Sequence, residues 1–147
     1  MPIKIEFLLT DCSYHRQEKD KQEMKDLLSL LHGKPIGAIA PISRHIRIAI
    51  ARDEKSPQDT PIIGMASLIP MRTLSCQKGS IEDVVVLKEY QGQGISRRLM
   101  ETLIGEAKKL CLTRLELTSH PSRVAANALY QKMGFQKRDT NAYRLEI

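Results

Sequence analysis

Several residue types are scarce in this chain, and each scarcity argues against a class of protein. Tryptophan is absent and aromatic residues make up only 4% of the 147 positions, so a surface that stacks nucleic-acid bases is not indicated. Cys12, Cys76 and Cys111 are odd in number and widely spaced, which argues against a disulfide framework or a zinc site. No apolar run approaches the roughly 20 residues that cross a bilayer. We therefore expect a protein without a metal, in the reducing cytoplasm and not in a membrane.

The net charge and the length further limit the expected partners and the number of domains. The formal net charge is +6, yet no basic run is interleaved with aromatic residues, so nucleic acid is not the expected partner. An acidic ligand such as a nucleotide cofactor explains the charge equally well. The length predicts one domain over residues 1–147, and the alternating start Met1–Glu6 is typical of a strand, not of a signal peptide.

The stretch Ile81–Met100 is predicted to form a strand, a glycine loop and a helix, and the rest of the chain is interpreted around it. Three consecutive β-branched residues favour an extended, buried backbone. They are Val84, Val85 and Val86. In the loop Gln91–Gly94, two glycines permit a sharp bend and the close approach of a ligand. Apolar residues then recur at helical spacing, which predicts a helix over residues 94–109.

The start of that helix is a predicted anion site. Its first amides lack internal partners and lie at the positive end of the helix dipole, and Arg97 and Arg98 add formal charge. A Walker loop is not favoured because no lysine follows the glycines, and a Rossmann fingerprint is not favoured because Arg97 replaces its third glycine. Taken alone, the loop also fits an ordinary turn between a strand and a helix.

The first half of the chain predicts a strand, a helix and a hairpin. Residues 3–9 alternate as a strand. A helix follows, capped by Asp11 or Ser13 and stopped at Gly33. Its apolar stripe consists of Met24, Leu27, Leu28 and Leu31, whereas its charged start, residues 16–23, is expected to face solvent or fray. Strands over residues 46–51 and 62–69 then form an antiparallel hairpin.

The second half predicts a parallel crossover and a closing hairpin. A short strand, Arg114–Thr118, returns parallel to the strand before the glycine loop. Ser122 is a candidate cap for a helix over residues 124–133, which ends at Gly134 with Phe135 packing back. In the tail, residues 136–147, Tyr143, Leu145 and Ile147 alternate, which predicts a hairpin. The sum is one mixed α/β sheet, antiparallel early and parallel at its centre.

Two motifs carry a family resemblance. Gln91-x-x-Gly94-x-Ser96 resembles the Gln/Arg-x-x-Gly-x-Gly/Ala signature of the GCN5-related N-acetyltransferases, with Ser96 as a departure at the last position. Asn127-x-x-Tyr130-x-x-x-Gly134-Phe135 looks like the closing helix of that family. The run from Ile81 to Val86 is also similar to the central strand of the hexosamine-phosphate branch, but it recurs in other branches. The resemblance implies the acyl-coenzyme A N-acyltransferase (GNAT) fold.

The resemblance also implies a binding site for acetyl-coenzyme A. The pantetheine would pair with the backbone of Val84, Val85 and Val86 as if it were another strand, entering where the parallel strands splay. The loop amides would receive the pyrophosphate, and Val86 or a neighbour would hold the oxyanion. The predicted cofactor-binding residues outside the strand are Gln91, Gln93, Gly94, Ser96, Arg97, Arg98 and Asn127. For Asn127, capping of the local backbone is an equal alternative.

Two residues are predicted to handle protons. Tyr130 is the candidate general acid for the departing thiolate, although a partly buried helix tyrosine is the commoner fate of such a residue. Alternation would place Glu82 and Asp83 on opposite strand faces, one toward the acceptor. Glu82 is the chosen general base, directly or through water, while Asp83, His120 or water remain alternatives. For either carboxylate taken alone, a solvated or ion-paired group is the commoner fate.

The predicted function is therefore N-acetyl transfer from acetyl-coenzyme A to a primary amine by direct attack in a ternary complex. The acceptor, a small molecule or a peptide amine, is not readable from the sequence. A catalytically weak or inactive coenzyme A-binding regulatory protein of the same fold is the alternative, and a nucleic-acid binder using the charged first helix is a further one. An exposed C-terminal hairpin would support a homodimer.

Overall fold

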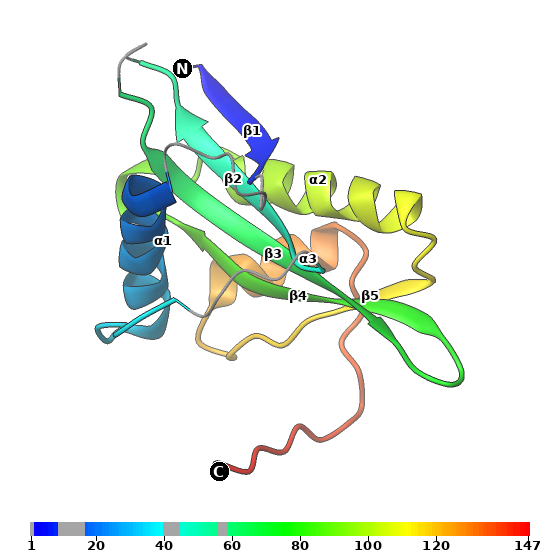
Figure 1. The fold of residues 1–147 in the computed structure, drawn as a ribbon. Coiled ribbons are helices and arrows are strands. Elements are labelled where there is room, and N and C mark those ends of the chain that lie inside the picture. The colour runs from blue at the N-terminus through cyan, green and yellow to red at the C-terminus, as the bar shows by residue number, and fades with distance from the viewer. Residues whose placement is uncertain (1, 9–16, 40–44, 56–58) are drawn as a thin grey trace. The chain divides into compact units, whose positions relative to one another are not determined.

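The computed structural model describes residues 2–8, 17–39, 45–55 and 59–147. The chain divides into two compact units, Met1–Leu117 and Thr118–Ile147, which are described separately below (Figure 1). That residues 1–147 act as one domain stays a prediction.

The described strands of the first unit form one five-stranded sheet whose spatial order follows the chain. They are β1 (Ile3–Phe7), β2 (Arg47–Asp53), β3 (Ile62–Arg72), β4 (Gln77–Val86) and β5 (Arg114–Glu116). The pairs from β1 to β4 are antiparallel, and β4 pairs with β5 in parallel. The predicted mixed sheet with a parallel pair is confirmed. β3 and β4 are longer than predicted, because the polar segment between them is mostly strand around a short turn at Thr73–Cys76.

Helices α1 (Gln17–His32) and α2 (Ile95–Lys109) cover opposite faces of this sheet. Met24 and Leu27 of α1 pack in a buried cluster that includes Met65 of β3. The neighbouring Gly64 instead approaches Leu99 of α2, which lies 3.5 Å from the position of a Cβ there. Consecutive strand residues point to opposite faces, so the two helices pack on different sides.

Both helices match their predicted apolar stripes. In α1 the stripe is buried or partly buried, and Gly33, with a φ of 67°, ends the helix as predicted. In α2, Ile95, Leu99 and Leu103 are buried at helical spacing. The predicted caps Asp11 and Ser13 lie outside the described residues. Among the helices that the structure describes, none has the length and apolar character to span a membrane.

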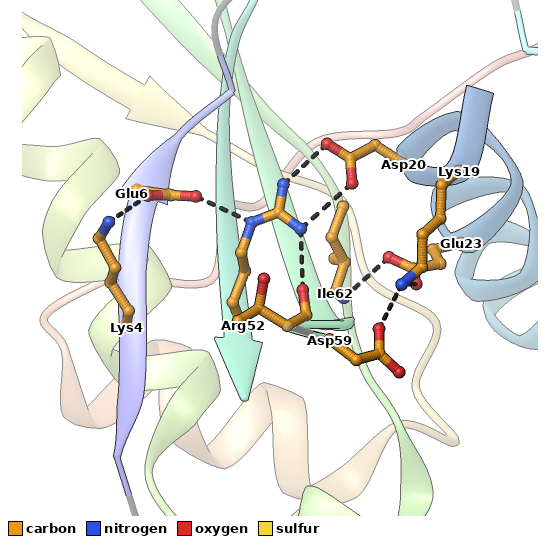
Figure 2. Close-up of polar contacts among 9 residues, drawn as sticks. Lys4, Glu6, Lys19, Asp20, Glu23, Arg52, Asp59 and Ile62 are labelled. Carbon is orange, nitrogen blue, oxygen red and sulfur yellow. Dashed lines mark hydrogen bonds and ion pairs between the residues drawn. The ribbon is translucent and has the colours of Figure 1, made fainter. Parts of the chain in front are cut away.

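The charged start of α1 is exposed along most of its described length, as expected, but Asp20 and Glu23 turn toward the sheet, which corrects the sequence-based expectation at these two positions. Asp20 is 2% exposed and Arg52 of β2 is 4% exposed. Figure 2 shows the Arg52 guanidinium between Asp20 and Glu6 of β1, with Nη2–Oδ2 and Nε–Oε1 distances of 2.7 and 2.8 Å. Glu23 also accepts a hydrogen bond from the Ile62 N–H at 3.0 Å. These charges fasten α1 to the sheet, because a buried ion requires a partner.

The second unit contains α3 (Val124–Lys132). Its N-cap is Arg123 and no side chain caps it, so the predicted cap at Ser122 is wrong; the Ser122 hydroxyl and N–H both contact His120 Nδ1 instead. The predicted helix end is confirmed. Gly134 has a φ of 95°, and the Phe135 ring packs edge-on against Tyr130 at 6.1 Å between centroids.

The C-terminal tail is not a hairpin. Residues 135–147 contain no strand, and Tyr143, Leu145 and Ile147 are exposed in this single chain. Alternation alone predicted strands here, but a strand also needs a neighbour to accept its backbone hydrogen bonds. None of the residues that the structure describes supplies one.

Candidate active site

The parallel pair opens partway along β4. Only Lys78, Gly79 and Ser80 pair with β5, whereas β4 continues to Val86. On that side, no described strand accompanies the rest of β4, residues 81–86. The backbone of this segment is therefore an edge that an extended ligand can pair with.

The direction of the main-chain groups on this edge follows from one hydrogen bond. The Leu87 N–H donates to the Ile63 carbonyl of β3 at 2.9 Å. Because main-chain groups alternate in direction along an antiparallel strand, the N–H and C=O of Val86 face away from β3. The Val86 carbonyl accordingly accepts from the Gln91 side chain at 3.0 Å. This contact ties the glycine loop to the strand end and leaves the Val86 N–H directed at the open edge.

The glycine loop leads directly into α2, and no side chain caps the start of this helix. A 3-10 turn, Lys88–Tyr90, precedes the loop. Gly92 and Gly94 have φ values of 77° and 76°, a region that other residues enter only at a cost. Gly94 is the N-cap and has no side chain to cap the helix, and the first helical bond runs from the Arg98 N–H to the Gly94 carbonyl at 3.1 Å.

The amides of the first turn of α2 are consequently available to a ligand. Those of Ile95, Ser96 and Arg97 precede the first helical bond and lack an intrahelical acceptor. A Cβ at Gly92 or Gly94 would meet no protein atom within 4 Å, so the space above the loop is open. Uncapped amides, a helix dipole and open space are the features that anion-binding helix starts share.

Three polar side chains around the glycine loop point away from the space above it. Arg97 pairs with Glu101 along α2 at 2.8 Å, and the Arg98 guanidinium donates to the Ile3 carbonyl of β1 at 2.8 Å. The Gln93 side chain donates to the Glu89 carbonyl at 3.4 Å. The two arginines thus contribute charge near the loop without reaching over it.

A support for the loop was not predicted from sequence. The Tyr90 hydroxyl donates to Asp53 Oδ2 at 2.7 Å, and Asp53, at the end of β2, is buried. Lys55 lies 3.4 Å from the same carboxylate and 5.7 Å from the Tyr90 ring centroid. The bond from Tyr90 holds the pKa of Asp53 below its ordinary value and raises the pKa of Tyr90. No sequence pattern links positions 53 and 90, because only the fold brings them together.

A β-bulge changes where the strand carboxylates point. Between Met65 and Ser67 the pairing advances three residues along β4 for two along β3. Asp83 sits in this bulge with a φ of 54°. Glu82 lies opposite Ser67, and the Ser67 hydroxyl is 3.2 Å from Asp83 Oδ2. Both carboxylates therefore lie on the face that α1 covers, and the expectation that they face opposite sides is wrong.

The two carboxylates have different neighbours. Glu82 accepts a hydrogen bond from the hydroxyl of Ser80, two residues earlier on the same face. Asp83 lies at the wall of a cavity of about 230 Å³ between α1 and the sheet. Glu82 does not line that cavity.

The remaining predicted residues belong to the second unit. The Asn127 side chain donates to the His120 carbonyl at 3.0 Å, which supports the local capping interpretation of Asn127. Tyr130 is buried, and burial raises the pKa of its phenol above the ordinary value. Nowhere in residues 2–8, 17–39, 45–55 and 59–147 do three His, Cys, Asp or Glu side chains gather as a metal site.

Comparisons with known proteins agree with this geometry. The model of the "Acetyltransferase (GNAT) family" matches residues 6–135. The [Ribosomal protein bS18]-alanine N-acetyltransferase of Escherichia coli (strain K12) is 37% identical over 60 residues, which is 41% of this chain and 40% of that protein. The chain thus matches well under half the length of this curated relative.

Two solved structures share the fold over nearly the whole of both chains. Glucosamine-6-phosphate N-acetyltransferase from Arabidopsis thaliana has a TM-score of 0.76 at 19% identity, covering 99% of each chain. Ribosomal-protein-alanine N-acetyltransferase from Brucella melitensis biovar Abortus 2308 has a TM-score of 0.74 at 16% identity, covering 99% of this chain and 100% of the other. With the family model matched across both sequence motifs and the open edge of β4, this chain belongs to the GNAT acetyltransferase family.

Proposed function

We propose that this chain transfers an acetyl group from acetyl-coenzyme A to a primary amine in a single ternary complex. The observation that carries the proposal is the uncapped start of α2 beside the unpaired edge of β4. One anion site and one free strand edge, joined by a short loop, match a ligand with a diphosphate at one end and amides along its arm.

The residues of the loop and strand fit this co-substrate. The amides of Gln93, Gly94, Ser96 and Arg97 would hold the pyrophosphate. The side chains of Arg97 and Arg98 would add positive charge nearby, and Gln91 would hold the loop to the strand through its bond to the Val86 carbonyl. The strand backbone from Val84 to Val86 would pair with the amides of the arm. Ser96 is small and is the second residue of α2, and its hydroxyl would donate to a phosphate oxygen. Asn127 is retained as a cofactor contact only as an alternative to its local bond with His120.

The chain's own groups would then serve the transfer. Acetyl-coenzyme A, when bound, supplies an acetyl thioester that an amine can attack. The Val86 N–H, directed away from β3, would donate to the thioester carbonyl oxygen, where negative charge develops. Glu82 would accept the proton that the amine loses, directly or through a water molecule.

Tyr130 is the proposed general acid on the strength of its sequence motif. Its raised pKa keeps the phenol protonated at neutral pH, so it is a hydrogen-bond donor throughout the reaction. A thiol has a pKa of about 8.5 and an unperturbed tyrosine about 10. Tyr130 would therefore donate a hydrogen bond to the departing thiolate sulfur. Complete transfer of its proton is less favourable, because the phenol has the higher pKa.

We also propose an acceptor class, an oligomeric state and a cellular compartment. A peptide N-terminus would parallel the alanine substrate named for the Escherichia coli relative, and a small amine fits the family as well. The exposed tail residues Tyr143, Leu145 and Ile147 would be covered in a homodimer. We expect the protein to act in the cytoplasm.

The test is titration calorimetry with acetyl-coenzyme A, followed by thiol release with a panel of amines. We expect saturable binding and amine-dependent release. Binding without release from any amine would favour the alternative, a coenzyme A-binding regulatory protein, and absence of binding at about 1 mM would contradict both.

The role of Glu82 has its own test. Glu82→Gln should lower kcat most at low pH, where the amine is most fully protonated and depends most on a base. Glu89→Gln, in the exposed turn before the loop, is the matched control. An unaltered pH profile would remove Glu82 from the mechanism.

A further inference from the structure

The cavity beside Asp83 is apolar except at one end. It lies between α1 and the sheet and has a volume of about 230 Å³. Aliphatic and thioether side chains form its walls, among them Met24, Leu28, Ile39, Ile48, Met65 and Ile69. Ser67 and Asp83 are its only described polar lining residues. Since liquid water occupies about 30 Å³ per molecule, an organic group of several non-hydrogen atoms fits.

Asp83 is held at this wall by an unusual backbone conformation. Its φ of 54° lies in the left-handed region, within the β-bulge of β4. Aspartate and asparagine enter this region more readily than most residues, yet such strain persists only where the surroundings enforce it. Left-handed residues and bulges gather at functional sites because they re-aim a side chain.

The Asp83 carboxylate has few described hydrogen-bond donors. Its described hydrogen-bond donor is the Ser67 hydroxyl, 3.2 Å away, which is equally close to the Glu82 carbonyl. One hydroxyl hydrogen serves one acceptor at a time. In the part of the chain that the structure describes, no Lys, Arg or His forms an ion pair with Asp83. A carboxylate beside an apolar wall is stabilised by a cation that arrives with a ligand.

From these features we propose that the acceptor presents a primary ammonium attached to an uncharged aliphatic group, and that Asp83 binds this ammonium. This inference rests on the proposed acetyl transfer and names the acceptor class for that site. The apolar walls take the aliphatic part, and the bulge places the ammonium next to the strand residues that follow Asp83. A sugar phosphate or other anionic acceptor finds no cation among the described lining residues.

Two sources supply this chemistry, a free aliphatic amine and a peptide whose first residue is aliphatic. The probes are 3-methylbutylamine against ethanolamine, and two pentapeptides that differ only in a first residue of leucine or glutamate. Each is titrated by NMR in the presence of coenzyme A and assayed for transfer with acetyl-coenzyme A. We expect the aliphatic member of at least one pair to bind about tenfold or more tightly, because each methylene in a fitted pocket is worth about that factor.

The variant that tests the carboxylate is Asp83→Asn. Asparagine tolerates a positive φ and keeps the shape of the side chain, so the fold is preserved while the charge is removed. We expect KM for the amine, and its Kd in the titration, to rise about tenfold or more, with the affinity for coenzyme A unchanged. Asp26→Asn, on the exposed side of α1, removes the same charge away from the cavity and should leave both constants unchanged.

The results separate this inference from the proposed function. Equal binding and use of polar and aliphatic amines, or an unchanged KM and Kd in Asp83→Asn, would overturn the inference while leaving acetyl transfer intact. Selective aliphatic binding that depends on Asp83, without transfer, would support the inference and contradict the enzyme. Binding of none of the four probes would overturn the inference.

Discussion

Replacement of Gly94 by alanine tests whether this glycine is needed for ligand binding or only for the backbone conformation of the loop. Gly94 has a φ of 76°, and an added Cβ would meet no protein atom within 4 Å. A non-glycine residue in this conformation costs about 1–2 kcal/mol, and the loss of unfolded-state entropy returns about 0.4–1 kcal/mol. The free energy of unfolding should therefore fall by about 1 kcal/mol, which lowers Tm by about 3 °C for a chain of this size.

The effect on acetyl-coenzyme A should be larger than this strain explains. The new methyl group would occupy the space proposed for the pyrophosphate, above the uncapped amides of α2. We expect Kd to rise at least about tenfold, or about 1.4 kcal/mol. Calorimetry supplies Kd, and denaturant unfolding of the same samples supplies the stability.

Gly33→Ala is the matched control. Gly33 has a φ of 67° at the end of α1, again with no protein atom within 4 Å of the added Cβ. It should lose similar stability while Kd stays unchanged. If both variants bind acetyl-coenzyme A like the unmodified protein, the loop is only a turn and the reasoning is refuted.

Three further perturbations test other parts of the account. Tyr130→Phe should lower kcat about 100-fold with Kd for the cofactor unchanged; equal kcat would remove its role as the acid. Asp20→Asn leaves the buried Arg52 guanidinium without its closest carboxylate and should cost about 3–5 kcal/mol in urea unfolding, so a loss below about 1 kcal/mol would contradict a buried ion pair. Burial raises the pKa of Glu6, but hydrogen bonds from Lys4 and Arg52 lower it below the usual 4.5 overall. Its carboxylate should thus stabilise the fold above pH 4.5 and lose this effect as pH falls through the lower folded value, and Glu6→Gln should flatten that part of the acid titration.

Local periodicity accounts for what the sequence predicted well. Alternation located β2 and most of β3, and the apolar stripe of α2 follows from residues three and four apart. Glycines at positive φ marked the ends of α1 and α3. The parallel return of β5 followed from the short connection and the handedness of crossovers.

Long-range pairing accounts for what the sequence could not predict. Asp20 looked like part of a solvated face because its partner Arg52 lies 32 positions away on a strand. The tail alternates like a strand, yet the described chain offers it no neighbour. Both errors arise because local patterns carry no information about which distant groups meet.

The site was predicted in outline and misjudged in detail. The strand, the loop and the helix start are local features, so they were predicted correctly, and the anion site that they suggest stays a prediction. The bulge at Asp83 was not, because nothing in the valine-rich run signals an extra residue against β3. Strict alternation therefore separated Glu82 from Asp83, whereas the structure places them on one face.

A crystal structure of the protein with coenzyme A tests the central proposal most directly. The account predicts pyrophosphate oxygens within hydrogen-bonding distance of the N–H groups of Gly94, Ser96 and Arg97, with the pantetheine arm lying along Val84–Val86. Coenzyme A bound elsewhere, or an α2 N-terminus covered by the protein's own side chains, would contradict it.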